Sequence, residues 1–427
     1  MNIVIFTDTY LPKIDGICIS VDHFTRILGS RGHNFVICAP KYGEHDIDHI
    51  ADNIQVIRFK NAPLPSYPDI KVVLPSHKKI TRAMTMFPPD LVHIQTPGLL
   101  GQYGVLAAKM YGVPLVGTYH TLVSEQDTYI SLYRLLKVDA LLDYFKSHKK
   151  IEKRLDKIER KESKSFKSQI IYKLTLGVYQ AGEVIISPSH LIKKDLQDGG
   201  ATTPIEVVSN GMDLDRFRGT VREAPSAANG PRLLHVGRIS FEKNCQVVIK
   251  AFALMLQKFP NATLDIVGDG PALTSIKIEA KHLGVFDKMN FPGFVPHGTL
   301  HELYPKYDLF MTASTMETQG LVVLEAMACG LPCVGVNAYA LPELIQHERN
   351  GFIVEPFDHI KMAERAIQLL SDPDLYRKFS AQSLSIASEH EVHACADRLE
   401  SVYQGIVDRH RAKKAASGGG LLGGFLQ

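Results

Sequence analysis

Two groups of charged residues stand where predicted strands give way to helices, and both could bind a negatively charged ligand. In the first group, Arg238 and Lys243 lie in the segment HVGRISFEKN. Both cations would lie beside free backbone N–H groups at the start of a helix, and such a loop fits a diphosphate. Because surface Arg and Lys side chains are commonly only solvated, the hypothesis depends on where these two are placed.

In the second group, a glutamate interrupts the apolar stretch 321–336. Burying a carboxylate without partners is costly, so we expect Glu325 to accept hydrogen bonds from the hydroxyls of a ligand. Glu317, two turns earlier, would face the same cleft, while Gln319 and Gly320 would expose backbone donors at the start of the helix. The alternative is that Glu317 caps the helix and Glu325 forms an internal ion pair.

A third loop, TDTYLPKIDG, ends in Gly16 and is followed by a helix predicted from about Ser20. A glycine just before a helix lets bare N–H groups approach an anion, and the helix dipole adds about half a positive charge there. The alternative is a structural glycine in a turn.

The signatures of several enzyme classes are missing from the sequence. There is no Gly-Lys dipeptide and hence no Walker loop, no GxGxxG after the first strand, and neither HExxH nor GxSxG. The segment GDGP from Gly268 resembles half a dinucleotide fingerprint, although a tight turn explains it equally well. Asp-x-Asp pairs begin at Asp46, Asp213 and Asp372, and we expect no metal role for them.

The elements that must position these loops are short β-branched runs alternating with longer helical stretches. Strands without in–out alternation, separated by helices, indicate parallel sheets covered on both faces. In such sheets ligands bind beyond the carboxyl ends of the strands. We predict one set of strands at 3–6, 35–38, 55–58, 91–95, 114–118, 183–187 and 205–208, and a second set at 232–236, 263–267, 289–291, 309–312 and 332–335.

This pattern predicts an α/β fold of two doubly wound, Rossmann-like domains that face each other across a cleft, and 427 residues suffice for two or three domains. The segment APSAANG suits an exposed connector. We therefore predict a first domain at 1–215, a linker at 216–231, a second domain at 232–395, and a C-terminal part at 396–427. That last part would combine a helix at about 390–412 with a flexible Gly-rich tail.

Composition narrows the class of protein. The chain has 48 Lys and Arg against 45 Asp and Glu, a balance that argues against nucleic acid as a partner. Its six cysteines include no CxxC pair, which is typical of a reduced, cytosolic protein. The N-terminus shows no secretory leader, and no run is apolar enough for a transmembrane helix. We expect a cytoplasmic location.

The motifs GRISxEKN and Ex7EAMACGLP resemble those of the family 4 retaining glycosyltransferases of the GT-B fold, as do SPS at 187–189, SNGMD at 209–213 and the opening TxxYxPxxxG. The resemblance covers essentially the whole chain, with the motifs in the right order. It implies an enzyme that moves a hexose from a nucleoside-diphosphate sugar, UDP-sugar above all, to an acceptor hydroxyl. It also implies that neither a metal nor another cofactor is needed.

The resemblance further implies roles for individual residues. Gly16 would offer its backbone to the diphosphate of the donor, which Arg238 and Lys243 would hold. Glu317 would engage the donor sugar, and Glu325 the ribose hydroxyls. The other implied donor contacts are the amides of Gln319, Gly320 and Leu321, the main chain of Val295 at the base, and His120 in the sugar pocket, although a histidine at a strand end is more often structural.

A basic segment of the sequence suggests that the protein binds a membrane surface, where a lipid acceptor would be found. Residues 146–167 contain ten Lys or Arg and four acids, a difference of +6. Ile151, Leu155 and Ile158 lie near one stripe of the implied helix, and a basic amphipathic helix is typical of binding to a membrane surface. The alternative is a solvated helix that packs its stripe on the first domain. The predicted membrane-surface residues are Lys149, Lys150, Lys153, Arg154 and Lys157.

The version ETQG, with Gln319 where the family often has Phe, resembles diacylglycerol glucosyltransferases, and so does the opening FTDTYLPKIDG, in which Asp15 replaces a common Asn or Gly. This resemblance implies a membrane-lipid acceptor such as diacylglycerol, and a peripheral position on the inner face of the membrane. Two alternatives stay open. One is an enzyme for a soluble, polysaccharide or cell-envelope acceptor, and the other is a non-enzymatic sugar-nucleotide-binding protein.

Overall fold

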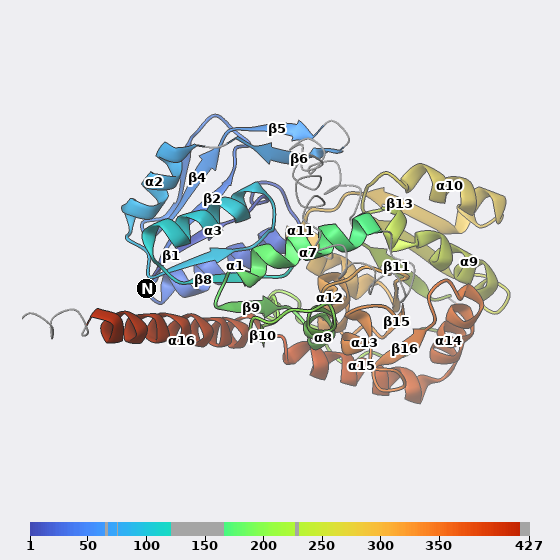
Figure 1. Cartoon of the computed structure of the whole chain (residues 1–427). Coiled ribbons are helices and arrows are strands. Elements are labelled where there is room, and N and C mark those ends of the chain that lie inside the picture. The colour runs from blue at the N-terminus through green and yellow to red at the C-terminus, as the bar shows by residue number, and fades with distance from the viewer. Residues whose placement is uncertain (65–66, 75, 121–165, 227–229, 419–427) are drawn as a thin grey trace, which may run out of the picture. The chain divides into compact units, whose positions relative to one another are not determined.

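The structure, a computed structural model, describes residues 1–64, 67–74, 76–120, 166–226 and 230–418 (Figure 1). The chain forms two compact units. The first unit consists of Met1–Ser187, Leu196–Val207 and Arg398–Gln427, and the second of Pro188–Asp195 and Val208–Asp397. The described residues of the predicted linker, 216–226 and 230–231, therefore belong to the second unit.

The first unit is built on an eight-stranded sheet with the order β10-β9-β8-β7-β1-β2-β4-β3. Its neighbouring strands are parallel except for the pair β3 and β4. The central strands are almost entirely buried, as expected where both faces are covered. The strands are β1 (Asn2–Phe6), β2 (Asn34–Pro40), β3 (Ile47–Ala51), β4 (Ile54–Phe59), β7 (Leu91–Ile94), β8 (Leu115–Thr118), β9 (Val184–Ser187) and β10 (Ile205–Val207).

Helices connect these strands, and a separate antiparallel pair, β5 (Asn61–Leu64) and β6 (Tyr67–Val73), lies between β4 and α2 in the chain. The helix after β1 begins at Gly16, earlier than the predicted start near Ser20, because the Asp15 carboxylate accepts a hydrogen bond from the Cys18 N–H and so caps the helix at this point. The helices are α1 (Gly16–Ser30), α2 (His77–Met86), α3 (Leu99–Tyr111), α7 (Phe166–Gln180) and α8 (His190–Asp198).

The second unit is built on a six-stranded sheet, all parallel, with the order β13-β12-β11-β14-β15-β16. Its strands and helices share one large apolar core. The strands are β11 (Arg232–Val236), β12 (Thr263–Val267), β13 (Met289–Gly293), β14 (Leu309–Met311), β15 (Cys333–Val336) and β16 (Gly351–Val354).

The helices of the second unit include three short 3-10 turns, η1 (Phe241–Lys243), η2 (Phe286–Lys288) and η3 (Tyr304–Lys306). Asp372 caps the helix that begins at Pro373. The α-helices are α9 (Cys245–Met255), α10 (Leu273–His282), α11 (His297–Leu303), α12 (Leu321–Ala328), α13 (Leu341–Leu344), α14 (His359–Ser371) and α15 (Pro373–Ser388).

The final helix, α16 (Val392–Gly418), begins in the second unit and continues in the first, where it is drawn in red in Figure 1. Its buried Tyr403 hydroxyl lies 2.6 Å from Nδ1 of His93 on β7, and Arg411 donates to Asp90 at 2.6 Å. The prediction that the flexible tail starts after residue 412 is wrong, because residues 413–418 extend this helix. Residues 419–427 lie outside the described part of the chain.

Every predicted strand is present, with its ends shifted by at most two residues. The prediction missed β3, β5, β6 and β16. β3 is a short, half-exposed edge strand with polar residues, so it carries no buried apolar run. Within the described residues, no helix combines the length and the apolar character needed to cross a bilayer.

Candidate active site

The strand order of the second unit reverses between β11 and β14, which are neighbours in the sheet. In an open α/β sheet, the loops that follow two such strands diverge at the carboxyl edge and leave room for a ligand. The loop after β11 contains Arg238 and Lys243, and the loop after β14 contains Glu317 and leads into α12. The structure therefore brings the two predicted charged groups together in one unit.

Asn244 holds these two loops against each other. Its side-chain amide donates to the carbonyl of Ala313 at 3.2 Å and to the hydroxyl of Thr315 at 3.1 Å. The N–H of Thr315 in turn donates to the carbonyl of Glu242. Asn244 is buried and has a φ of 50°, a left-handed conformation that asparagine tolerates better than most residues. Asn244 lies in the segment HVGRISFEKN, but its type and position in the sequence indicate no role for it.

Lys243 and Glu317 meet in this arrangement. The Lys243 ammonium donates to a Glu317 carboxylate oxygen at 2.5 Å, and both side chains are less than one-fifth exposed. The residue predicted to hold a diphosphate therefore lies beside the residue predicted to engage a sugar. Arg238, by contrast, is exposed, and its side chain makes no hydrogen bond or ion pair within the described residues.

Gly268 lets two loops approach closely. A Cβ on Gly268 would lie 1.9 Å from the carbonyl oxygen of Gly237, and Gly268 has a φ of 135°, which favours glycine. The Ile239 N–H also donates to the Asp269 carbonyl. The segment GDGP is therefore the tight turn that the sequence analysis offered as the alternative to a dinucleotide fingerprint, and it supports the loop that carries Arg238.

The start of α12 presents bare backbone donors. Gly320 is the N-cap of the helix, with a φ of 90°, so Glu317 does not cap it. The N–H groups of Gly320, Leu321 and Val322 donate no hydrogen bond within the described part of the chain. Three amides at a helix start form a ready site for an anion. The side chain of Gln319 is buried nearby rather than exposed.

Glu325 lies inside α12 and is only 2% exposed. One of its carboxylate oxygens lies 3.1 Å from Nε2 of His297, and the other accepts a 2.6 Å hydrogen bond from the Tyr304 hydroxyl. Burial is the main cause that raises the pKa of Tyr304 well above its ordinary value, and the nearby Glu325 carboxylate is the second. The tyrosine hydroxyl therefore keeps its proton and remains a donor. His297 and Tyr304 therefore contact the carboxylate that was predicted to accept hydrogen bonds from a ligand. His297 and Tyr304 had not been predicted.

Val295 lies in the segment between β13 and α11, two residues before His297. It is half-buried, and within the described residues neither its N–H nor its carbonyl forms a hydrogen bond. This main chain is therefore available to a ligand, such as the base of a nucleotide, close in sequence to the histidine that contacts Glu325.

Gly16 is placed in the first unit, at the first position of α1, where the N–H groups have no partner within the helix. Asp15 just before it accepts hydrogen bonds through both carboxylate oxygens, from the Cys18 N–H at 2.9 Å and from the Thr9 hydroxyl at 2.7 Å. The carboxylate that would repel a phosphate is thus engaged in capping.

His120, also in the first unit, follows the end of β8. Its Nε2 lies 2.6 Å from the Gln95 side-chain oxygen, and burial lowers the pKa of His120 to about 4. Burial similarly lowers the pKa of His93 to about 3. Near neutral pH, His120 is therefore a neutral hydrogen-bonding group rather than a cation. The five predicted membrane-surface residues lie outside the described part of the chain.

Several aspartates of the Asp-x-Asp pairs form ion pairs with basic side chains. Asp46 forms ion pairs with Lys41 and Lys79, and Asp48 pairs with Arg58. Asp215 pairs with Arg218. Across the described ranges, no group of three or more His, Cys, Asp or Glu side chains is arranged to hold a metal ion.

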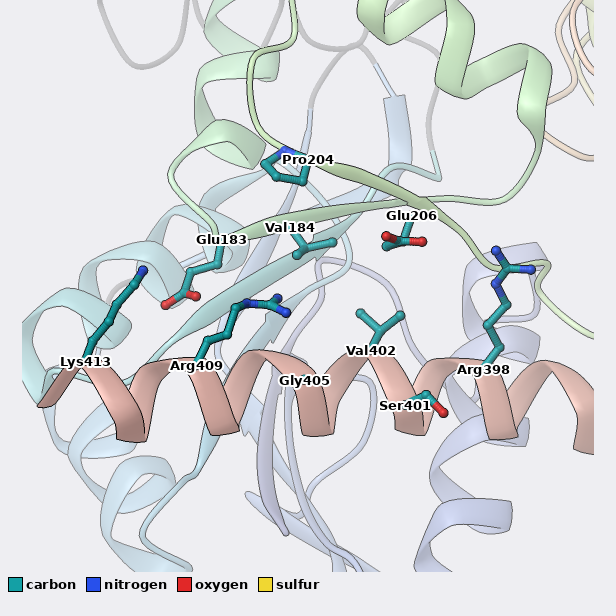
Figure 2. A pocket seen from close by; sticks show the side chains of 10 residues that line it. All are labelled: Glu183, Val184, Pro204, Glu206, Arg398, Ser401, Val402, Gly405, Arg409 and Lys413. Carbon is teal, nitrogen blue, oxygen red and sulfur yellow. The ribbon is translucent and has the colours of Figure 1, made fainter. Parts of the chain in front are cut away.

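A hollow of about 670 Å³ lies in the first unit between β9, β10 and α16 (Figure 2). Arg398 and Arg409 of α16 extend toward it from one side, and Glu206 from the other, while Val184 and Val402 lie between them. It contains none of the residues predicted to bind the donor.

Two family patterns match consecutive parts of the sequence. Residues 14–216 match Glycosyltransferase Family 4, and residues 220–385 match Glycosyl transferases group 1. Together they span both units, and the predicted donor residues of the second unit lie within the second match.

Similar proteins include two alpha-monoglucosyldiacylglycerol synthases. That of Streptococcus pneumoniae is 27% identical over 82% of this chain and 74% of its own length, and that of Acholeplasma laidlawii is 25% identical over 97% and 99%. A D-inositol 3-phosphate glycosyltransferase of Thermobispora bispora is 27% identical over 78% and 75%. The crystal structure of Anabaena HepE in complex with UDP matches with a TM-score of 0.69 at 19% identity, over 95% of this chain and all of that one, which confirms the predicted GT-B fold.

Proposed function

We propose that this chain, which belongs to the glycosyltransferases of the GT-B fold, moves a hexose from a UDP-sugar to a hydroxyl of a membrane lipid such as diacylglycerol, with retention at the sugar carbon. The product would be a glycolipid. The observation that carries the donor half of the proposal is the contact between Lys243 and Glu317, beside the free amides at the start of α12.

The chemical problem is the departure of a nucleoside diphosphate, on which negative charge builds as the sugar leaves. Lys243 and the amides of Gly320 and Leu321 would neutralise this charge with little reorganisation, because the fold already holds them in place, and the exposed Arg238 would add a second cation from the same loop. Glu317 would hold the sugar next to Lys243. Glu325 would bind the ribose and Val295 the base, and Gly16 and His120 remain predicted contacts to the donor from the first unit.

The lipid half of the proposal is supported by the names of two relatives, both alpha-monoglucosyldiacylglycerol synthases, and by the ETQG version of the donor motif. The basic segment 146–167 would hold the enzyme at an anionic membrane surface. We therefore propose that the protein is cytoplasmic and lies peripherally on the inner face of the membrane. The relative named as a D-inositol 3-phosphate glycosyltransferase favours a second candidate function, transfer to a soluble acceptor.

A screen of nucleotide sugars for released diphosphate, with and without vesicles containing diacylglycerol, tests the proposal. We expect release from a UDP-hexose, strongly increased by the vesicles, together with a glycolipid product. Release with D-inositol 3-phosphate or an oligosaccharide but not with lipid would favour a soluble or polysaccharide acceptor. No release from any sugar nucleotide, despite nucleotide binding, would favour a non-enzymatic binding protein.

We predict that transfer persists when divalent ions are removed with EDTA. The proposed charge neutralisation uses Lys243, Arg238 and backbone amides, so no step needs a metal ion. Rates of hexose transfer before and after chelation, and again after adding Mg²⁺ or Mn²⁺, measure the effect. Complete loss of activity that a divalent ion restores would contradict the prediction.

We predict that the protein binds vesicles with anionic lipids at low salt and releases them at high salt. Each cation near such a surface contributes about 1 kcal/mol before screening, so replacing the five predicted membrane-surface residues with Ala should weaken vesicle binding at least tenfold. Sedimentation with vesicles measures the fraction of protein bound at each salt concentration. A control variant of equal net charge replaces five exposed lysines of the second unit, Lys258, Lys281, Lys288, Lys306 and Lys361, and should bind as the wild type does. Equal losses in both variants, or no binding by the wild type, would contradict the role of the segment.

A further inference from the structure

The side chain of Gln319 is turned into the protein, although its sequence neighbours Gly320 and Leu321 are proposed to bind the donor. It is 2% exposed. Its Oε1 accepts a hydrogen bond from the Asn210 N–H at 2.9 Å, and its Nε2 donates to the Ser209 hydroxyl at 2.5 Å. A buried amide that is satisfied on both sides fixes the position of whatever it joins.

Ser209 connects this amide to a histidine. Its hydroxyl oxygen accepts from Gln319 and, at 3.3 Å, from the Gly211 N–H, and it lies 2.9 Å from Nδ1 of His390. A serine hydroxyl has two acceptor positions and one proton, so with both acceptor positions used the proton goes to His390. Nδ1 of His390 must then be unprotonated. This agrees with the burial that lowers the pKa of His390.

Gln319 contacts the segment 209–212, which in turn contacts the segment 390–392, and both segments lie close to a passage of the chain from one unit to the other. The chain passes between the units at residues 187–188, 195–196, 207–208 and 397–398, and the last two of these passages lie closest in sequence to the two segments. Just inside the second unit, Met212 donates to the His390 carbonyl at 2.7 Å and accepts from the Val392 N–H at 3.0 Å. Gly211 has a φ of 78° and packs against Val392, where a Cβ would lie 2.8 Å from a methyl carbon.

We propose that Gln319 is a positioning residue for sugar transfer, which fastens the donor-binding start of α12 to the two connecting segments 209–212 and 390–392. The proposal rests on the proposed function, because the amides of Gly320 and Leu321 matter only where a diphosphate binds. The backbone of Gln319 is continuous with those amides, so the hydrogen bonds of its side chain determine where they point.

Two replacements of Gln319 distinguish a positioning role of its hydrogen bonds from a role in which the side chain only fills space in the core. Gln319→Leu keeps the approximate volume and removes both hydrogen bonds. We expect the Kd for UDP to rise about ten- to hundredfold, because two buried polar groups lose their partner and the amides lose their fixed position. The affinity for uridine, which has no phosphates, should stay near that of the wild type, since Glu325 and Val295 are untouched.

Gln319→Glu keeps the acceptor for the Asn210 N–H and loses the donor to Ser209. The Ser209 hydroxyl would then donate to the new carboxylate, and Nδ1 of His390 would have to be protonated to donate to Ser209. The carboxylates of Glu343 and Glu389 also face His390 and favour its protonation. We expect the affinity of this variant for UDP to approach that of the wild type as the pH falls from 8 to 6, a recovery that Gln319→Leu should not show.

The matched control is Gln346→Leu in the same unit. The Gln346 side chain holds a surface turn through Arg349 and the Glu343 carbonyl and is not part of the proposed donor site. Calorimetry with UDP, NMR titration with uridine, and thermal unfolding would be measured for all four proteins. Equal Kd values for UDP in the wild type and Gln319→Leu, or a parallel loss of uridine binding, would overturn the positioning role. If the wild type binds none of UDP, ADP and GDP, the donor site itself fails.

Discussion

We expect the replacement of Lys243 with alanine to lower the turnover number about 100- to 1000-fold, and Arg238→Ala to have an effect of the same order. Removing one preorganised group that stabilises charge in the transition state typically costs about 3–4 kcal/mol. Both cations lie in the loop after β11, next to the loop that leads into α12. Neither is needed to hold the core, since Arg238 is exposed and Lys243 is half-buried at the loop surface, so the fold should survive both changes.

The contact of Lys243 with Glu317 makes the two residues interdependent. In Lys243→Ala the Glu317 carboxylate loses its cation and can repel the diphosphate. We therefore expect the double variant Lys243→Ala, Glu317→Gln to lose less activity than the product of the two single losses. Arg238→Ala combined with Glu317→Gln should come closer to the simple product, because Arg238 makes no contact with Glu317 within the described residues.

Steady-state rates with a UDP-hexose and thermal unfolding would be measured for each variant. Lys250→Ala is a matched control, because Lys250 also forms an ion pair, with Glu279 at 3.3 Å, but on the surface of α9. It should keep wild-type turnover. Near-normal turnover in both Arg238→Ala and Lys243→Ala would remove the assignment of a diphosphate to this loop.

The sequence carries enough information to predict that these loops occupy one site. Buried β-branched runs identify the strands, and in a parallel sheet the residues just after them collect at one edge, so Lys243 and Glu317 could be expected to meet. In the structure the Lys243 ammonium and the Glu317 carboxylate are in contact. The parallel direction of most strands follows from the same regular alternation of strands and helices.

Other features depend on tertiary contacts that periodicity does not reveal. Tyr304 lies 21 residues from Glu325 in sequence, and in a helix-like segment a tyrosine is more simply interpreted as core. The return of α16 to the first unit depends on pairs such as Tyr403 with His93, which are 310 residues apart. β3 is paired on one side only and polar, so nothing in its sequence separates it from a loop.

Glu325→Gln should reduce the preference of the protein for ribose in the nucleotide. A carboxylate has about four acceptor positions. Tyr304 and His297 each engage one oxygen, so an acceptor position remains on each oxygen for the ribose hydroxyls. Hydrogen bonds to a charged group contribute about 1.5–3 kcal/mol, which corresponds to roughly 10- to 150-fold in affinity. We expect the wild type to bind UDP that much more tightly than 2′,3′-dideoxy-UDP.

In Glu325→Gln the amide oxygen can still accept from Tyr304 while its NH₂ group donates to the His297 ring, so the helix should remain folded with a neutral group in the same place. The ratio of the two Kd values should then fall to a few-fold, mostly through weaker binding of UDP. Tyr304→Phe leaves the carboxylate charged and should retain most of the ratio. Calorimetry with both nucleotides measures the ratio of Kd values for the wild type, Glu325→Gln and Tyr304→Phe. An unchanged ratio in Glu325→Gln would mean that the carboxylate only anchors Tyr304 and His297 within the second unit, as the internal pair considered from the sequence would do.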